Sequence, residues 1–206
     1  MNLKRGVFGV LCVVVGVLIL AVSIAKATLD INAKDDNADR LRSNQFNFVV
    51  KNNNGTTESI SYSLPTVSML PSNPLYGFKR VRDYLWIQFA KGFVSKSKIG
   101  LLIADKKMAE ARMLAENNQM KMAIETIKDA FDQLKSAYET LNYEAVETDE
   151  IRQLKIKEYE AGLAYVEILK PMGEAFDLDT EKYSQLVNDL NKWNEERKTE
   201  KETFGY

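Results

Sequence analysis

An uncharged run from Gly6 to Ala25 constrains this chain more than any other feature of its sequence. A helix of about 20 residues spans roughly 30 Å, which is the thickness of the hydrocarbon core of a bilayer. Lys4 and Arg5 precede the run, and positive residues favour the cytoplasmic side of a membrane. The run therefore predicts a single-pass anchor in the cell membrane, with the carboxyl-terminal remainder extracytoplasmic. A signal peptide is the alternative, because cleavage after Ala27 would follow small residues and release a secreted chain.

Small residues recur every seven positions inside this run, at Gly9, Gly16 and Ser23. On a membrane helix they would share one face and allow a second helix to approach closely. We interpret them as a candidate surface for self-association of the anchor. The alternative is that glycine is simply frequent in membrane helices.

The run and the patterns that follow it divide the chain into five parts. We expect a cytoplasmic stub over 1–5, an anchor or signal peptide over 6–25, a stalk over 26–64 that includes a hairpin over 45–64, a helical bundle over 65–202 and a tail over 203–206.

Apolar and polar residues alternate in two stretches on either side of Asn54-Gly55. The apolar positions are Phe46, Phe48 and Val50, then Ile60, Tyr62 and Leu64. A period of two is typical of strands, and Asn-Gly is a strong signal for a hairpin turn. The pattern predicts a short β-hairpin or extended arm, which must lie on other elements because a two-stranded ribbon alone is marginally stable.

Five helical segments follow, each with an apolar residue at every third or fourth position. Asn73 and Pro74 are typical of a helix start. The stripe of this first helix, which we expect in the core, consists of Leu75, Phe78, Val81, Leu85, Phe89 and Phe93. Thr148 is expected to cap the fourth helix, which should end before Pro171, and the fifth should fray from Glu195 onward. Short connections make neighbouring helices antiparallel, so the fold class is mainly α: an up-down bundle of four to five antiparallel helices.

Composition argues against most catalytic chemistry. The chain has no His, and its single Cys lies within the apolar run, at Cys12. The commonest general base, the commonest metal ligand and any intramolecular disulfide are therefore absent from the remainder. The formal net charge of -1 disfavours a nucleic-acid binder. We expect no enzyme activity, no cofactor and no metal.

A series of short motifs runs through residues 64–141. It reads Leu64-Pro65, Leu70-Pro71, Pro74-Leu75-Tyr76, Lys79, Arg82-Asp83 and Ala104-Asp105-Lys106-Lys107-Met108. The series resembles a bacterial family of extracytoplasmic helical domains of unknown function. Thr66-Val67-Ser68 and Lys107 depart from the family pattern, which has Tyr-Pro-Gly and Arg there. The resemblance implies a location and a helical fold, and it implies no activity.

Polar residues of these motifs form the candidate site, which consists of Tyr76, Lys79, Arg82, Asp83 and Asp105. Lys79 and Asp83 are four residues apart on one predicted helix, and Arg82 could pair with Asp105 across two antiparallel helices. We interpret the set as a polar clasp that holds the first helical hairpin together. A ligand site is the alternative.

Charge is uneven along the helices. Between Lys79 and Lys107 there are eight basic and two acidic residues, whereas between Glu139 and Glu202 there are 17 acidic and nine basic. The two halves could attract each other within one bundle. Alternatively, the basic first hairpin could face anionic lipid or a wall polymer.

These observations favour a non-enzymatic module of the cell envelope, tethered by residues 6–25, that binds a protein partner or itself. The alternative is a ligand-binding or chaperone-like protein with an apolar groove between helices. Its lining would be Trp86, Phe89, Phe93 and Trp193. A carboxylate-pair hydrolase is a third class, but no pair of acids stands out from ordinary helix surface charge.

Overall fold

A computed structural model describes residues 45–51, 57–175 and 180–203 of the chain. The predicted anchor, with Gly9, Gly16 and Ser23, lies outside the described residues, as does most of the predicted stalk. Among the helices within the described ranges, none combines the length and apolar character needed to cross a bilayer.

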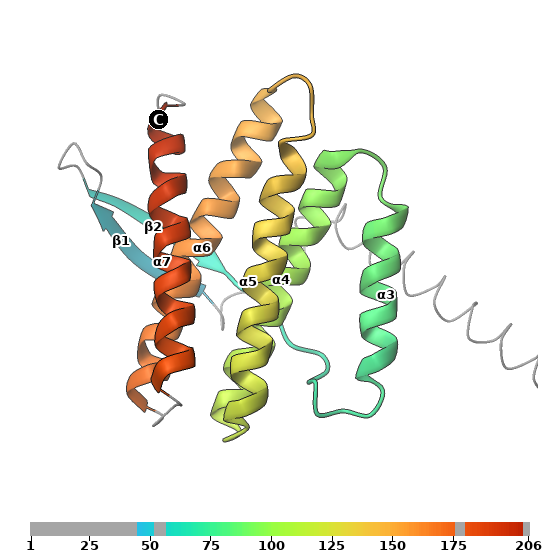
Figure 1. The fold of residues 1–206 in the computed structure, drawn as a ribbon, viewed down its shortest axis with the longest axis vertical. Helices are drawn as coiled ribbons and strands as arrows, with labels where there is room; N and C mark the ends of the chain where they lie inside the picture. The colour runs from blue at the N-terminus through green and yellow to red at the C-terminus, as the bar shows by residue number, and fades with distance from the viewer. Residues whose placement is uncertain (1–44, 52–56, 176–179, 204–206) are drawn as a thin grey trace, which may run out of the picture.

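Five helices and a two-stranded sheet make up the described structure (Figure 1). The elements are β1 (Gln45–Lys51), β2 (Thr57–Ser63), α3 (Tyr76–Phe89), α4 (Phe93–Glu116), α5 (Met120–Leu141), α6 (Asp149–Ala175) and α7 (Thr180–Thr203). Successive helices run in opposite directions. The expectation of a mainly helical fold, with an up-down arrangement of helices behind a hairpin, is confirmed for this part of the chain.

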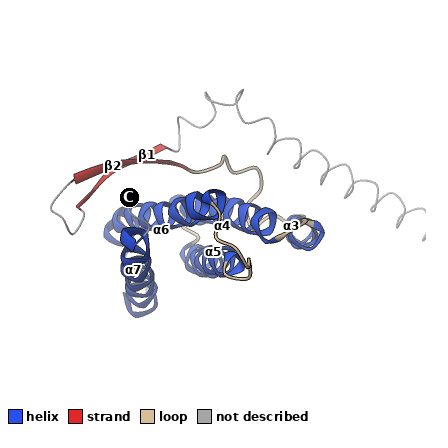
Figure 2. Cartoon of the chain, turned by 90° about the horizontal axis from the view of Figure 1, so that it is seen from above, coloured by secondary structure: helices blue, strands red, loops and turns tan. Residues whose placement is uncertain are grey.

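The hairpin forms an outer layer over the helices (Figure 2). Its strands pair antiparallel, with Phe48 opposite Ile60 and Phe46 opposite Tyr62. Ile60 and Tyr62 are buried, and both strands pack on α6. The sheet is therefore stabilised by the helix beneath it, as a two-stranded ribbon requires.

The main core lies between α4, α5, α6 and α7. Alanines allow α4 and α5 to approach closely, and a Cβ atom added to Gly100 would lie 2.9 Å from the Cβ of Ala137. Trp193 of α7 packs edge-on against Phe131 and Tyr138 of α5, with ring centroids 6.2 and 5.6 Å apart. These aromatic contacts dock the last helix on the bundle.

Three helix boundaries differ from the predicted ones, each for a local reason. At the first, the backbone N–H of Leu75 donates to Asn73 Oδ1 (2.9 Å), so Asn73 caps a turn and α3 begins at Tyr76. At the second, α6 continues through Pro171 to Ala175. Met172 is buried beyond this proline, and its packing holds the last turn of the helix.

The third boundary is the end of α7, which continues to Thr203 where fraying was expected. The guanidinium of Arg197 lies 4.7 Å from the ring centroid of Tyr138, and Lys155 Nζ lies 3.2 Å from Glu200 Oε1. These contacts to α5 and α6 hold the charged end of α7 in place. The predicted cap of α6 is confirmed, because the N–H of Ile151 donates to Thr148 Oγ1 (3.3 Å).

The orientation of α3 corrects the predicted core. This helix lies at the edge of the molecule and packs against α4 (Figures 1 and 2). Its predicted core stripe is mostly exposed: Phe78 is 68% and Phe89 70% exposed. The buried face instead carries Lys79, Asp83 and Trp86. Trp86 packs in a small cluster with Ile99 and Ile103 of α4, separate from the main core.

Candidate functional site

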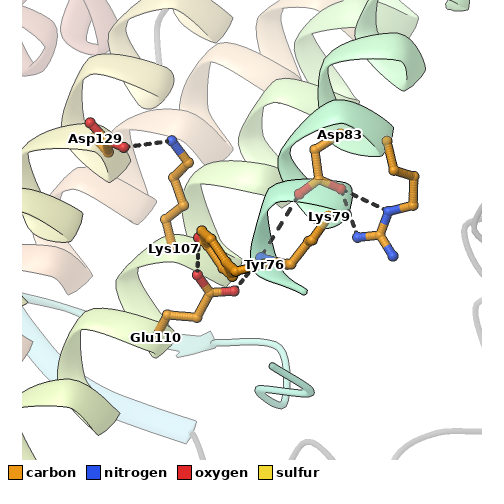
Figure 3. Close-up of polar contacts among 7 residues, drawn as sticks. Tyr76, Lys79, Asp83, Lys107, Glu110 and Asp129 are labelled. Carbon is orange, nitrogen blue, oxygen red and sulfur yellow. Dashed lines mark hydrogen bonds and ion pairs between the residues drawn. The ribbon is translucent and has the colours of Figure 1, made fainter. Parts of the chain in front are cut away.

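A network of charges joins α3 to α4 around the carboxylate of Glu110 (Figure 3). The Tyr76 hydroxyl donates to Glu110 Oε2 (2.6 Å), and Lys79 Nζ pairs with Glu110 Oε1. Lys79 also lies 3.8 Å from Asp83 Oδ2, one turn further along α3. Tyr76, Lys79, Asp83 and Glu110 therefore form a clasp between the two helices, as Figure 3 shows.

Arg82 joins this clasp in a different way from the one predicted. Its guanidinium Nη2 lies 2.7 Å from Oδ1 of Asp83, the next residue, and it does not reach across to Asp105. Two cations and two anions thus balance within the clasp. Such compensation is what allows ion pairs to be buried, because an unpaired charge in the same place would be costly.

Glu110 was absent from the predicted site, although it is the centre of the clasp. It is 2% exposed and stands between Ala109 and Ala111 in an otherwise apolar turn of α4. In the sequence, the feature that could have identified Glu110 as a buried acid is its position between two alanines. Lys107, beside the clasp in Figure 3, pairs with Asp129 of α5 at 3.2 Å and so belongs to the next helix contact.

Asp105 lies in a second cluster, away from the clasp. Its carboxylate accepts hydrogen bonds from the hydroxyl of Tyr62 on β2 (2.9 and 3.0 Å) and from that of Tyr165 on α6 (2.8 Å). The three side chains come from β2, α4 and α6 and are all buried. Asp105 therefore fastens the hairpin to the bundle, a role that its position in the motif did not reveal.

Burial raises the pKa of Asp105 to about 7, and the hydrogen bonds from Tyr165 and Tyr62 and the charge of Lys157 offset part of that rise. Burial, with the neighbouring carboxylate, also raises the pKa of both tyrosines. The tyrosines therefore stay protonated and remain hydrogen-bond donors. A carboxyl group with such a pKa binds its proton near neutral pH.

Glu158 is a further buried acid that was absent from the predicted site. Its Oε1 accepts a hydrogen bond from Ser97 of α4 (2.6 Å). Burial raises its pKa to about 8, with a further contribution from the charge of Asp105. Its Oε2 and both polar atoms of the Asn194 amide have no hydrogen-bond partner among the described residues. Glu158 interrupts the apolar stripe of α6 between Leu154 and Ala161. That interruption is the sequence feature that could have identified it as a buried acid.

Raised carboxyl pKa values are found at catalytic sites and also in structural networks. Here both acids are enclosed by side chains of the bundle, and they accept hydrogen bonds from tyrosine and serine hydroxyls. In the part of the chain that the structure describes, no group of three or more His, Cys, Asp or Glu residues is arranged to hold a metal ion. The geometry supports a structural role for these acids.

The exposed side of α3 is the remaining candidate. We call its apolar stripe the outer face of α3, which consists of Phe78, Val81, Tyr84, Leu85 and Phe89. Leu85 is half-buried and the other four are exposed. Their spacing of three and four residues places them on one side of the helix. Arg80 and Arg82 border this face.

The four residues of the predicted apolar groove are not brought together. Trp193 is buried between α7 and α5, and Trp86 is buried between α3 and α4. Phe89 is exposed, and the ring of Phe93 faces that of Tyr143 with centroids 5.7 Å apart. The described structure therefore gives no support to a groove with this lining.

Comparison with known proteins identifies a family match but no function. A protein family described as a domain of unknown function (DUF5667) matches residues 68–163. The match includes the clasp, Asp105 and Glu158, and it stops before α7. No curated protein and no solved structure matches the chain. The expected resemblance to an uncharacterised domain of unknown function is supported, and the match brings no activity with it.

Proposed function

We propose that this chain is a membrane-anchored, extracytoplasmic helical module of the cell envelope that acts by binding rather than by catalysis. Residues 6–25 are long and apolar enough to serve as the anchor, and Lys4 and Arg5 favour a cytoplasmic amino end. The remaining residues would then stand outside the cytoplasm.

The observation that carries this proposal is the outer face of α3. A helix that packs on a bundle normally turns its apolar stripe inward and its charges outward. α3 does the opposite, because Lys79 and Asp83 face α4 while Phe78 and Val81 face outward. A row of large exposed apolar side chains on one side of a helix is typical of an interaction site.

The buried polar clusters support the same function by fixing what is presented. The clasp around Glu110 holds α3 on α4, and the hydrogen bonds of Tyr62 to Asp105 hold the hairpin on α6 and α4. Charge-assisted hydrogen bonds have defined geometry, so they position α3 more strictly than apolar contacts alone could. The outer face is therefore presented on a rigid support.

Cysteine labelling in cells tests location and binding together. In a Cys12→Ser background, Gln88→Cys places a thiol on the exposed side of α3, and Glu125→Cys places a matched thiol on the exposed side of α5. We expect a membrane-impermeant maleimide to label position 125 from outside while position 88 is protected. Both positions should be labelled after the cells are dissolved in detergent.

The other outcomes count against particular parts of the proposal. Labelling at both positions in intact cells would mean that the outer face of α3 is unoccupied, which contradicts binding there. No labelling at either position before solubilisation would place the bundle inside the cell. A mature amino terminus at Thr28, read by mass spectrometry, would replace the anchor with a cleaved signal peptide.

Self-association of the anchor is a separate part of the proposal. Gly9, Gly16 and Ser23 would share one face of a membrane helix. Gly16→Leu should then lower the fraction of cross-linked dimer in membranes, because a bulky side chain separates the helices. Unchanged dimerisation, with Val15→Leu as the matched control, would reject this interface.

A further inference from the structure

We infer that the outer face of α3 docks on the surface of an anionic lipid bilayer. This inference rests on the proposed function, because it takes the bilayer to be the one that holds the anchor. It gives the outer face a partner of defined chemistry.

The arrangement of α3 is that of a helix lying in a membrane interface. At about 100° per residue, the five residues of the outer face cover one side of the helix. Arg80 borders this side as an exposed charge, whereas Arg82, on the other edge, is already paired with Asp83. Interfacial helices bury such an apolar side at the headgroup boundary, while flanking basic side chains extend to the lipid phosphates.

The exposed charges in the stretch of chain that contains α3 are of one sign. The acids between Ser59 and Arg112 are Asp83, Asp105 and Glu110, and all three are buried. The exposed charges in that stretch are basic, and they belong to Arg80, Lys91 and Lys98. Lys98 is paired with Glu150, whereas Arg80 and Lys91 stand near the two ends of α3. Such a surface complements anionic headgroups.

A second copy of the chain fits this surface less well. Two outer faces packed together would bring the two copies of Arg80 together, and the one acid of α3, Asp83, is buried and already paired with Arg82. The acidic half of the chain offers the opposite charge, but its large exposed apolar side chains, Tyr143 and Val146, lie in the connection between α5 and α6, and the described residues of α6 and α7 add none. The described residues of that half therefore present no apolar helix face to match that of α3. A wall polymer would supply negative charge for Arg80 and Lys91 but no hydrocarbon to cover the apolar side chains of α3. A bilayer supplies both.

Position and tether length also favour the bilayer. α3 lies at the end of the row formed with α6 and α4 (Figure 2), and four of the five side chains of its outer face are exposed. The chain between residues 25 and 45 can span at most about 70 Å when fully extended. The anchor would therefore keep α3 within reach of the membrane at a high effective concentration.

The test uses the full-length chain reconstituted in vesicles. Gln88→Cys in a Cys12→Ser background carries an environment-sensitive fluorophore at the exposed side of α3, and Glu125→Cys carries the same label on α5 as a control. Vesicles contain phosphatidylcholine alone, or with roughly a third phosphatidylglycerol, together with nitroxide-labelled lipid. We expect a blue shift and strong quenching at position 88 in the anionic vesicles, weaker quenching in neutral vesicles or at high salt, and little at position 125.

Matched substitutions then assign the effect to the outer face. Val81→Glu should reduce the docked fraction about tenfold or more, since it places a charge where hydrocarbon is expected. Val49→Glu, at an exposed valine of β1, should leave docking unchanged. Arg80→Gln should weaken the dependence on phosphatidylglycerol, whereas Lys121→Gln on α5 should not.

Each contrary result has a distinct meaning. Failure of the chain to float with vesicles would overturn the anchor, and with it the proposed function. Stable insertion without quenching at position 88 would contradict docking of α3 on the bilayer, and it would be compatible with the proposed membrane anchor. A blue shift that depends on protein density and not on anionic lipid would assign the outer face to a second copy of the chain, and would also overturn the inference.

Discussion

Replacing Asp105 by asparagine should raise the stability of this protein at alkaline pH. The folded protein raises the pKa of Asp105 from 3.8 to about 7, mainly through burial. That difference is about 3 pKa units, and each unit corresponds to about 1.4 kcal/mol. Ionising Asp105 in the folded state therefore costs up to about 4 kcal/mol, and a neutral amide at this position would avoid the cost.

The sign of the pH dependence follows from the same shift. A group whose pKa is higher in the folded state binds its proton more tightly there, so it stabilises the fold at low pH. This contribution is lost as the pH rises from about 4 to about 7. The groups that act on Asp105 are Tyr62 of β2 and Tyr165 and Lys157 of α6, and the oxygen of an asparagine side chain can still accept from both tyrosines.

Urea unfolding of the full-length chain in a non-ionic detergent, followed by far-ultraviolet circular dichroism, measures the effect. At about pH 8 we expect Asp105→Asn to raise the free energy of unfolding by up to about 4 kcal/mol, and at about pH 4 by much less. Asp189→Asn, at an exposed position on α7, controls for the loss of one negative charge. An Asp105→Asn variant that is destabilised at about pH 8 would refute the reasoning, because it would show that the ionised carboxylate stabilises the cluster.

Three further changes test the other buried contacts. Burial raises the pKa of Glu158 to about 8, so Glu158→Gln should stabilise the protein at about pH 9 and have little effect at about pH 5, as urea unfolding would show. Lys79→Met should cost about 3 kcal/mol by leaving the Glu110 carboxylate unpaired, and Lys79→Met combined with Glu110→Leu should recover most of that loss; no recovery would contradict a compensating pair. A Cβ at Gly162 would lie 2.7 Å from a ring carbon of Trp193, whereas one at Gly77 meets nothing within 4 Å. Gly162→Ala should therefore lower the free energy of unfolding by about 1–3 kcal/mol, and Gly77→Ala should raise it slightly, as thermal melts of the two variants would show.

The helices and the hairpin could be predicted because their signals are local. Alternation on either side of Asn54-Gly55 predicted the two strands, and spacings of three and four predicted five helices. The pairing of Lys79 with Asp83 could also be predicted, since it depends only on the helical repeat. Contacts within one element need no knowledge of how elements are placed relative to one another.

Contacts between helices could not be predicted in the same way. The pairing of Arg82 with Asp105 was inferred from two antiparallel helices, but it requires a particular rotation and axial shift of α4 against α3. In the structure that register brings Glu110 to α3, while Asp105 faces β2 and α6. A single sequence does not specify the axial register of α4 against α3. The predicted clasp therefore contained Asp105 in place of Glu110.

The orientation of α3 shows a related limit of periodicity, and it bears on function. An apolar stripe at helical spacing indicates that a helix has two faces, and it does not say what covers the apolar one. Phe78 and Phe89 fit a core as well as they fit an external partner. What distinguishes the two cases is the opposite face, where Lys79 and Asp83 are spaced to pair with each other and with an acid on α4. A helix whose charged face is internally compensated can turn that face inward, and its apolar face is then available for binding. Compensation on the polar side of an amphipathic helix is thus the sequence feature that allows its apolar side to face outward.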